Sequence, residues 1–402
     1  MISCLCRNVR NKLLKLSAGT VAFSLRLAVG GEGGSPTRKP SDSRRLKIVH
    51  VSPSYFDDAS VIGGGERYAQ SLAGAMVRKH DTVLVSFGRV RSTFVRNGLR
   101  LEIYPAMGLI DGMNFNPLNV SFLRELLDAD VIHCHQHQVV VTNLAVLFGA
   151  LWRIPVFVTD LGGWSYNYAE QLKLDSLVRN FLAISRFSAA ALPLGAPYEV
   201  IHGGVDDTFL HPPPGRESGL YALYVGRVTP HKGINYLVEA VGGDLPLRVI
   251  GRVYHRDYFT LLTSLAAGGD VRFQDDASDD DLAAAYQGAL VTVLPSVYLD
   301  IYGAGHTVPE LLGLVLLESM ACGTPVICTA VGAMPEIVRD GVTGFIVPPN
   351  DPAALREKIL WLRDHPKEAK VMGETGRDLV RARFTWETVA ERCYAAYVEG
   401  SS

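Results

Sequence analysis

Short apolar runs of strand length alternate with helical segments along most of this chain, and the whole alternation occurs twice. The first series begins at residues 46–53 and the second at residues 222–226. Runs that are apolar at every position, rather than at every second one, are typical of parallel strands covered by helices on both faces. The sequence therefore predicts an α/β protein with two doubly wound, Rossmann-like parallel-sheet domains.

The expected elements follow from these runs. Strands are expected at 46–53, 82–87, 131–135, 155–159, 181–185, 222–226, 247–251, 271–274, 291–295, 325–329 and 344–347. Helices are expected at 66–79, 139–152, 233–242, 278–289, 313–322, 334–340, 351–364 and 385–400. The longest apolar stretch, Val139 to Trp152, is shorter than the ~18 residues of a membrane span, so we interpret it as a core helix. In the acidic run near residue 280, Ser278 followed by Asp281 is a helix-capping pattern.

A proline-rich stretch separates the two series. Three consecutive prolines follow His211, and they can continue neither a helix nor a central strand. We therefore expect a leader (1–45), an N-terminal domain (46–210), a linker (211–219), a C-terminal domain (220–384) and a final helix (385–402). Doubly wound sheets bind ligands at the carboxyl ends of their strands, which predicts a ligand cleft between the two domains. This pattern alone fits dehydrogenases, sugar transferases and periplasmic-type binders equally well.

Composition narrows the class of protein. The apolar fraction of 48% is that of an ordinary globular chain, and a net charge of -2 argues against a nucleic-acid partner. The six cysteines lack paired spacing, and Cys134 and Cys328 lie in strand-like runs, where a thiol is usually a small buried hydrophobe. A reducing, cytoplasmic location fits this usage better than a disulfide framework.

The leader differs from the rest of the chain. Its first part is basic, with no acidic residue before Glu32, and residues 30–43 are rich in glycine, serine and proline. Arg26 interrupts the apolar region, which disfavours a signal peptide. Two interpretations stay open: an amphipathic segment on the inner face of the plasma membrane, and a disordered leader or a wrongly assigned start.

Two glycine-containing turns are candidate phosphate sites. Gly64 and Gly65, followed by Glu66, stand between a strand and a helix, where backbone amides and the helix dipole attract an anion. Without G-x-G-x-x-G this is a weak signal, and a tight turn explains it too. Arg227 and Lys232 follow the first strand of the second series. An arginine fork and a mobile ammonium at a strand's carboxyl end suit a diphosphate.

The third candidate is the strongest. Glu310 and Glu318, with seven residues between them, stand on either side of Gly313, which begins an apolar helix. Gly313 and Leu314 can offer backbone N–H groups to a phosphate or a sugar hydroxyl. Glu318 can accept hydrogen bonds from a ribose diol, and Glu310 precedes the helix beside a reacting sugar.

From about residue 46 to 384 the chain resembles the family 4 retaining glycosyltransferases of the GT-B fold. The resemblance rests on Glu-x7-Glu with the following Gly-Thr-Pro-Val, on Arg227 with Lys232, on the turn at 64–67, and on 331–338, 341–345 and 202–206. It implies two Rossmann-like domains facing across a cleft, with the final helix packed back on the N-terminal domain. It also implies a nucleotide-sugar donor, a saccharide or lipid-linked saccharide acceptor, and no metal or other cofactor.

Residue by residue, the resemblance implies that Arg227 and Lys232 hold the donor diphosphate, that Glu318 binds the ribose, and that Glu310 contacts the transferred sugar. Gly64 and Gly65 would approach the donor phosphate, with Glu66 on the acceptor side. Whether Glu310 ever acts as a nucleophile stays open. The departing diphosphate would be stabilised by cations and helix dipoles.

The chain departs from the family pattern in two places. Leu161 occupies a position where relatives carry a histidine, so that Asp160 becomes the acceptor-side candidate there. A longer loop, 298–308, precedes Glu310, and its Asp300 and His306 either meet a substrate or belong to a solvated insertion.

A histidine-rich strand end, residues 133–137, admits two readings. A structural zinc site needs further ligands at a defined spacing from these histidines, and the sequence shows none. We therefore expect His135 or His137 to line the acceptor cleft rather than to bind a metal.

The function expected from these residues is transfer of a sugar from a UDP- or GDP-sugar, in cell-surface polysaccharide or glycolipid biosynthesis. Two alternatives remain: a catalytically silent nucleotide-sugar binder or partner subunit, and a GT-B sugar phosphorylase. Without the dinucleotide fingerprint, a dehydrogenase is disfavoured.

Overall fold

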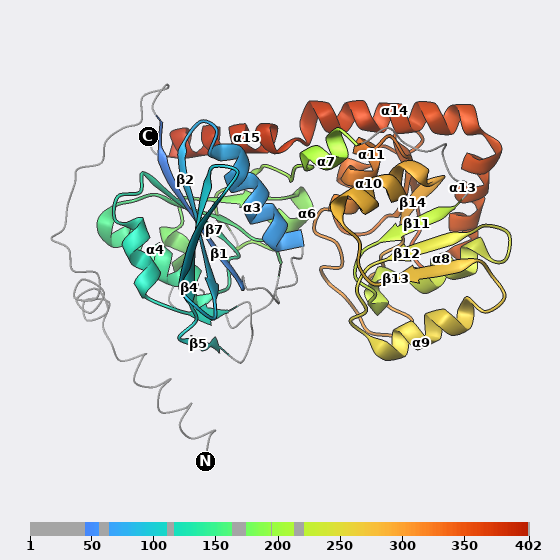
Figure 1. Ribbon diagram of the computed structural model, residues 1–402, viewed down its shortest axis with the longest axis horizontal. Helices are drawn as coiled ribbons and strands as arrows, with labels where there is room; N and C mark the ends of the chain where they lie inside the picture. Colours follow the sequence, from blue (N-terminus) through green and yellow to red (C-terminus); the bar gives the residue numbers. More distant parts are fainter. Residues whose placement is uncertain are drawn as a thin grey trace, which may run out of the picture. The chain divides into compact units, whose positions relative to one another are not determined.

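The computed structural model of the chain describes residues 45–55, 64–110, 116–162, 174–193, 195–212 and 221–400. The leader to residue 44, most of the proline-rich stretch and Gly63 lie outside the described residues. The chain forms two compact units (Figure 1). Unit 1 comprises residues 1–182, 193–199 and 394–402, and unit 2 comprises residues 183–192 and 200–393.

Unit 1 is built on an eight-stranded sheet. Its strands, in chain order, are β1 (Lys47–Tyr55), β2 (Asp81–Gly88), β3 (Ser92–Arg96), β4 (Leu99–Pro105), β7 (Val131–His135), β8 (Val156–Thr159), β9 (Asn180–Ala183) and β10 (Tyr198–Val200). The spatial order is β10-β9-β8-β7-β1-β2-β4-β3, with only β3 shown to run antiparallel to its neighbour among the described pairings. A separate pair, β5 (Gly108–Leu109) and β6 (Pro117–Leu118), is also antiparallel.

Two helices flank this sheet. They are α3 (Gly64–Met76), which packs on β1 and β2, and α4 (Val140–Trp152), which packs on β7, β8 and β1. Figure 1 shows them on opposite sides of the strands, as expected for a doubly wound sheet. Short 3₁₀ turns lie at Ser121–Leu126 and Leu174–Leu177. The apolar stretch interpreted as a core helix is α4, which has 13 residues.

Unit 2 contains a six-stranded, fully parallel sheet. Its strands are β11 (Ala222–Val225), β12 (Leu247–Ile250), β13 (Val271–Gln274), β14 (Val291–Leu294), β15 (Val326–Thr329) and β16 (Gly344–Val347), in the order β13-β12-β11-β14-β15-β16. Strands β11, β14 and β15 are buried at every position. This confirms the prediction, made from continuous apolar runs, of a sheet covered on both faces.

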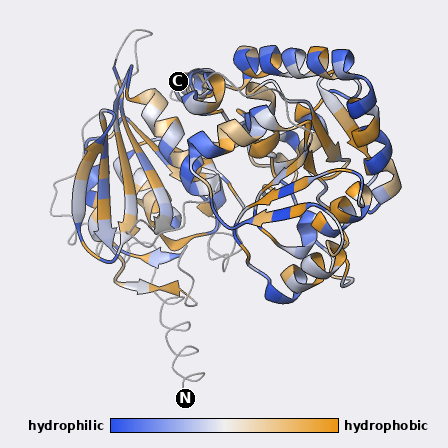
Figure 2. Cartoon of the chain, turned by 45° about the vertical axis from the view of Figure 1, so that its right-hand side comes forward, coloured by the Kyte–Doolittle hydropathy of each residue, from blue (hydrophilic) through white to orange (hydrophobic). Residues whose placement is uncertain are grey.

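The helices of unit 2 follow the strands in alternation. They are α6 (Arg186–Ala189), α7 (Asp207–Leu210), α8 (Ile234–Val241), α9 (Arg256–Leu265), α10 (Asp279–Gly288), α11 (Leu314–Ala321), α12 (Met334–Ile337), α13 (Pro352–Asp364), α14 (Pro366–Arg383) and the first half of α15 (Trp386–Gly400), whose residues from 394 belong to unit 1, with a 3₁₀ turn at Pro230–Lys232. Figure 2 shows hydrophilic and hydrophobic positions alternating along α14, whose buried residues recur every three or four positions. As predicted, the Ser278 side chain caps α10 by accepting from the Asp281 N–H.

The division of the chain differs from the predicted boundary at residue 210. Residues 183–192 belong to unit 2 because their polar groups are bonded there. The Ser185 hydroxyl donates to the Leu311 carbonyl at 2.7 Å, and the N–H groups of Arg186 and Phe187 donate to the Glu336 carboxylate at 2.8 Å each. The predicted strand 181–185 accordingly ends at Ala183, since Ser185 forms the N-terminal capping box of α6.

Three further differences have local causes. Helix α3 begins at Gly64, two positions before the predicted start. Helix α12 ends at Ile337 rather than at 340, where the Arg339 N–H instead donates to the Thr343 hydroxyl at 2.9 Å. The prediction also omits the β3–β4 hairpin, although its turn is the pair Asn97 and Gly98, both at positive φ. An Asn-Gly pair between strands is a strong hairpin signal.

Candidate functional site

In unit 2 the candidate residues gather at the carboxyl end of β11. Gly226, directly after this strand, has φ +145°, and the Gly251 backbone approaches it so closely that a Cβ on Gly251 would lie 2.0 Å from the Gly226 carbonyl oxygen. The exposed Arg227 follows, and its backbone oxygen accepts a hydrogen bond from the buried Tyr224 hydroxyl at 2.9 Å. Among the described residues no carboxylate lies within ion-pair distance of Arg227. Its guanidinium is therefore available to an anion.

Lys232 and Glu310, which are far apart in the sequence, form an ion pair here. The Lys232 ammonium lies 2.5 Å from Oε2 of Glu310, and both side chains are largely buried, with 11% and 13% of their surfaces exposed. The Ser296 hydroxyl lies 3.4 Å from the same carboxylate oxygen. The Glu310 carboxylate holds the ammonium in place, and the ammonium keeps further N–H donors. Such an ammonium can stabilise phosphate oxygens.

The backbone of Glu310 is also held. Its carbonyl oxygen accepts from the Ala333 N–H at 3.0 Å, and a Cβ on Gly332 would lie 2.1 Å from that oxygen. Gly332 has φ +57°, which suits glycine. The loop after β15 thus fixes the main chain of Glu310, while Lys232 fixes its side chain.

Helix α11 carries the third pair of predicted residues. Gly313 precedes the helix with φ +91° and has no side chain that could cap it, so that the N–H groups of Leu314 and Val315 stay open at its start, while the Leu316 N–H donates to the Gly313 carbonyl at 2.9 Å. One and a half turns later, Oε2 of Glu318 accepts a hydrogen bond from the Tyr286 hydroxyl at 2.8 Å. Tyr286 lies on α10 and is fully buried. It orients a carboxylate that keeps other lone pairs for a ligand.

His231 completes this cluster, although the sequence analysis did not single it out. Burial, together with the charges of Lys232, Arg227 and His306, lowers the pKa of His231 to about 3, against the opposing charge of Asp300. The imidazole is therefore neutral at physiological pH and surrounded by positive charge. In the sequence, only the position of His231, two residues before Gly233 and beside Lys232, could have indicated that it belongs to this cluster.

In unit 1, the glycine turn lies where the sequence predicts it. Gly64 is exposed and begins α3, while Gly65 and Glu66 are partly exposed in its first turn. A Cβ on Gly65 would make only ordinary contacts, 3.8 Å from Leu161. Packing within unit 1 therefore does not require glycine at position 65. The absence of a side chain there leaves room for a ligand to approach the backbone closely.

The predicted acceptor-side residues follow β7 and β8. Nε2 of His137 lies 2.6 Å from the Asp175 carboxylate, and the His137 N–H donates to the Asp160 carboxylate at 3.3 Å. Burial raises the pKa of Asp160. These contacts make Asp160 and His137 neighbours, in agreement with the common strand edge that the sequence predicts for them.

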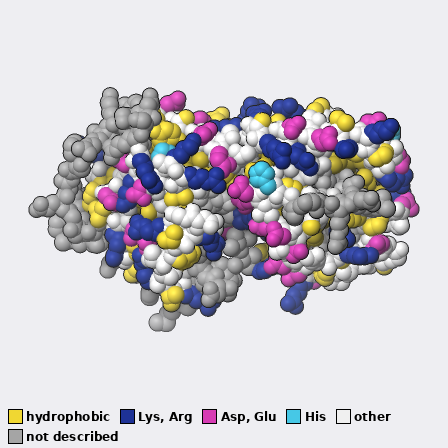
Figure 3. Space-filling model, turned by 45° about the horizontal axis from the view of Figure 1, so that its top comes forward, with side chains coloured by type: hydrophobic (Ala, Val, Ile, Leu, Met, Phe, Trp, Pro, Cys, Tyr) yellow, Lys and Arg dark blue, Asp and Glu magenta, His cyan; other side chains and the backbone are white. Residues whose placement is uncertain are grey.

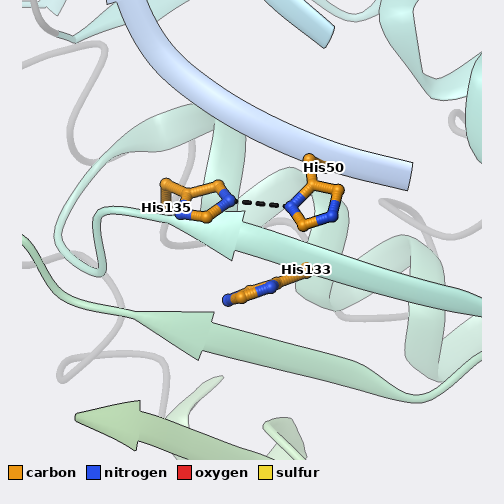
Figure 4. Close-up of side chains that lie close together, drawn as sticks. All are labelled: His50, His133 and His135. Carbon is orange, nitrogen blue, oxygen red and sulfur yellow. Dashed lines mark hydrogen bonds between the residues drawn. The ribbon is translucent and has the colours of Figure 1, made fainter. Parts of the chain in front are cut away.

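His135 instead faces the interior of unit 1. It is 1% exposed, and its Nε2 lies 2.9 Å from Nδ1 of His50, on the neighbouring strand β1 (Figure 4). His133 completes a cluster of three stacked or tilted rings. Its Nε2 is bonded to the Thr159 hydroxyl at 2.8 Å, and its Nδ1 to the Tyr397 hydroxyl at 2.7 Å.

The cluster of His50, His133 and His135 has the spacing of a metal site, with ligand nitrogens within 4.8 Å of one another. Four of its six ring nitrogens are already hydrogen-bonded, and among the described residues Nε2 of His50 and Nδ1 of His135 have no partner. Burial lowers the pKa of all three, that of His50 to about 3. The contacts therefore describe a network of neutral imidazoles in the core.

The expectations from the sequence also concern membrane-spanning helices, cysteines and surface charge. Among the described residues no helix is both long and apolar enough to cross a bilayer. Cys134, Cys322, Cys328 and Cys393 are free and buried, as the sequence predicts for Cys134 and Cys328. Figure 3 shows acidic and basic side chains interspersed on the face that it presents, in keeping with a net charge of -2.

Comparison with known proteins places this geometry in context. Residues 62–209 match the model "Glycosyltransferase Family 4", and residues 207–379 match "Glycosyl transferases group 1". A phosphatidyl-myo-inositol mannosyltransferase of Mycobacterium leprae is 26% identical over 88% of this chain and 96% of its own length. An uncharacterised glycosyltransferase of Methanocaldococcus jannaschii is 31% identical over 47% of this chain, which spans about half the length of that relative.

Among solved structures, HepE of Anabaena, crystallised with UDP and glucose, is similar to this chain with a TM-score of 0.68 at 17% identity. The match covers 87% of this chain and 99% of HepE. At this identity the similarity establishes the arrangement of strands and helices.

Proposed function

Because the chain belongs to the family 4 glycosyltransferases of the GT-B fold, we propose that it transfers a sugar from a UDP- or GDP-sugar to a saccharide or lipid-linked saccharide. We propose further that the anomeric configuration is retained, that no metal takes part, and that the product belongs to a cell-surface polysaccharide or glycolipid. The observation that carries the proposal is the Lys232–Glu310 ion pair beside Arg227 and the open end of α11.

The chemistry of these groups supports the nucleotide-sugar part of the proposal. Breaking the bond between the sugar and the diphosphate leaves negative charge on phosphate oxygens. The Lys232 ammonium, the Arg227 guanidinium and the N–H groups at the start of α11 can stabilise that charge as it develops. These are the roles that a divalent cation plays in other phosphate chemistry, which is why we propose a reaction without one.

The two carboxylates have separate parts. Glu318, oriented by Tyr286, would bind the ribose hydroxyls of the donor. Glu310, with its oxygen on Lys232, would contact the hydroxyls of the transferred sugar and hold the ammonium toward the phosphate. On the acceptor side we propose Asp160, His137 and Glu66, with Gly64 and Gly65 beside the donor phosphate. His135, bonded to His50, would act only through its neighbours.

Relatives support the substrate class. HepE is described in complex with UDP and glucose, and the Mycobacterium leprae relative is named a mannosyltransferase of phosphatidyl-myo-inositol. A lipid-borne acceptor would bring the protein to the inner face of the membrane from the cytoplasm. We propose that residues 1–45 assist this, and deletion of the leader should then move the protein out of the membrane fraction.

A panel of UDP- and GDP-sugars, measured by calorimetry with EDTA present, tests the proposal. One donor should bind the wild type, and Lys232→Ala and Glu318→Ala should lose it. NMR of the product's anomeric signals would then report retention or inversion. Binding without transfer or hydrolysis would indicate a silent homologue, and turnover with inorganic phosphate alone would indicate a phosphorylase.

A further inference from the structure

The loop between β14 and Glu310 is a closed hairpin in unit 2. The His306 N–H donates to the Tyr298 carbonyl at 2.7 Å, and the Asp300 N–H donates to the Ala304 carbonyl at 3.0 Å. Leu299 and Gly305 form an antiparallel bridge between these bonds. Most residues of the hairpin are exposed, in keeping with the predicted alternative of a solvated insertion, but its two sides are paired.

Asp300 organises the hairpin from within. Its side chain is 4% exposed, and its Oδ1 accepts from the N–H groups of Tyr302 and Ala304 at 2.9 and 3.0 Å. Its Oδ2 lies 2.8 Å from Nε2 of His306. Burial acts to raise the pKa of Asp300, but the hydrogen bonds from His306 and the two amides outweigh it and lower that pKa. The carboxylate is thus ionised and orients the His306 ring with Nε2 inward.

The hairpin does not need His306 to hold it in place. The Asn350 side-chain amide donates to the Leu299 carbonyl at 3.0 Å, and the Tyr298 hydroxyl accepts from the Gly332 N–H at 2.9 Å. These anchors and the amides on Asp300 account for the fold of the loop. The imidazole, 30% exposed and with Nδ1 turned away from Asp300, is an additional feature that the fold leaves unexplained.

The His306 ring lies beside the cationic cluster, which consists of Arg227, His231 and Lys232. Its ring centroid lies 5.0 Å from that of His231, the neighbour of Lys232, and the Val297 N–H at the base of the hairpin donates to the His231 carbonyl at 2.9 Å. Arg227, Lys232 and His306 all act on His231 electrostatically, with Asp300 as the opposing charge. Arg227 and Lys232 thus lie close to one partly exposed imidazole, an arrangement that suits the binding of an anion.

We propose that His306, with its Nε2–H on the Asp300 carboxylate, is protonated on both ring nitrogens when the donor is bound and donates its Nδ1–H to the terminal phosphate of the nucleoside diphosphate in the donor. This rests on the proposed function and extends it to a donor contact by a segment outside the Glu310–Glu318 motif. The nucleoside monophosphate lacks that phosphate, so the contact contributes to binding of the diphosphate alone. Asp300 acts as a positioning residue.

Calorimetry with UDP, GDP, UMP and GMP tests this assignment. His306→Ala should weaken binding of the preferred diphosphate about tenfold, the size of one charge-assisted hydrogen bond, and change monophosphate binding less than twofold. His306→Gln, which keeps a polar side chain, serves where the alanine variant folds poorly. His365→Ala, at an exposed histidine bonded to the Trp361 carbonyl, is the matched control and should bind like wild type.

A double-mutant cycle separates positioning from structure. Asp300→Asn should weaken diphosphate binding in the wild-type background and add no further loss to His306→Ala. Full additivity would assign Asp300 to the hairpin's fold alone. If Lys232→Ala loses the diphosphate while both His306 variants bind it normally, the contact proposed here is wrong and the transferase function stands. If the wild type binds none of the four nucleotides, both proposals fail.

Discussion

Each unit gathers ionisable side chains on its parallel strands or in the loops that follow them, but the two clusters are in opposite electrostatic states. In unit 1, His50, His133 and His135 are at most 1% exposed and neutral, and their bonds are to each other, a threonine and a tyrosine. In unit 2, Lys232 and Glu310 are charged and paired, and Arg227 beside them is exposed. Two parallel sheets therefore carry a closed network of hydrogen bonds within the strands of one unit and an open, charged cluster after the strands of the other.

The contrast separates stability from function. A buried neutral imidazole with its nitrogens bonded is a core residue, because its value lies in packing and hydrogen bonding. A charged pair with unused donors costs desolvation energy that a ligand can offset. We therefore expect substitutions in the histidine cluster to change the free energy of unfolding and substitutions in the cationic cluster to change donor use.

The largest expected effect is on catalysis. Lys232→Ala removes the ammonium and leaves the Glu310 carboxylate near the phosphate, and we expect kcat/KM to fall about 10²- to 10³-fold. Steady-state kinetics with the identified donor measure this. Lys358→Ala, at a lysine of unit 2 paired with Glu357, is the control and should keep wild-type kinetics. A Lys232→Ala enzyme with near-normal turnover would remove the cluster from the mechanism.

The next effect is on stability. His133→Ala removes a buried ring and both of its hydrogen bonds, and should lower the free energy of unfolding by about 2–4 kcal/mol in urea titrations. Tyr397→Phe deletes only the hydroxyl on His133 and should cost about 1 kcal/mol. Both variants should keep nucleotide affinity, because the proposed diphosphate and ribose side chains, Arg227, Lys232 and Glu318, lie in unit 2. Loss of that affinity in either one would contradict the separation.

Acid should weaken unit 1 through the same histidines. Their folded pKa values lie below the ordinary 6.5, so the unfolded chain takes up protons that the folded chain cannot. Stability is complete above pH 6.5 and falls as pH drops toward 3, by about 1.4 kcal/mol per pH unit for each such histidine. Urea midpoints between pH 7 and 5 measure the slope. The substitution His50→Leu should reduce the slope of the unfolding free energy against pH. An unchanged slope would mean that His50 is protonated in the folded protein as it is in the unfolded chain.

The smallest effect concerns the ribose contact. Tyr286→Phe leaves the Glu318 carboxylate without the hydroxyl at 2.8 Å, and nucleotide affinity should fall about three- to tenfold. Tyr221→Phe is the matched control, since its hydroxyl bonds the Ala285 carbonyl at 2.8 Å instead. Equal effects of the two substitutions would indicate loss of α10 packing rather than a change at Glu318.

Most strands and helices of the fold can be predicted from the local pattern of apolar residues. The strands β7, β13 and β16 have the predicted bounds, and the apolar helix α4 lies within one residue of its prediction. These successes share a cause, because each element is defined by its own run of residues. Glu310, Glu318, Arg227 and Lys232 are likewise proposed from motifs that are local in sequence.

What could not be predicted depends on partners distant in sequence. His50 lies alone in its strand, and only the parallel register of β1 with β7 sets it against His133 and His135. Tyr286 and Glu318 come from different helices, and the contact of His231 with His306 needs the hairpin of 298–308 to close. Periodicity contains no information about such pairs, so the supporting residues of both clusters emerge only from the fold.

Gly332 restricts how this site can vary. Because any side chain there would collide with the Glu310 carbonyl, the position admits glycine alone, whereas Gly341, at φ +70° with open space around it, faces only backbone strain. Random mutagenesis of the loop should therefore return active clones with changes at 341 but none at 332. Selection for a new donor sugar would have to reshape the surroundings of Glu310 from other segments, such as the hairpin that carries His306.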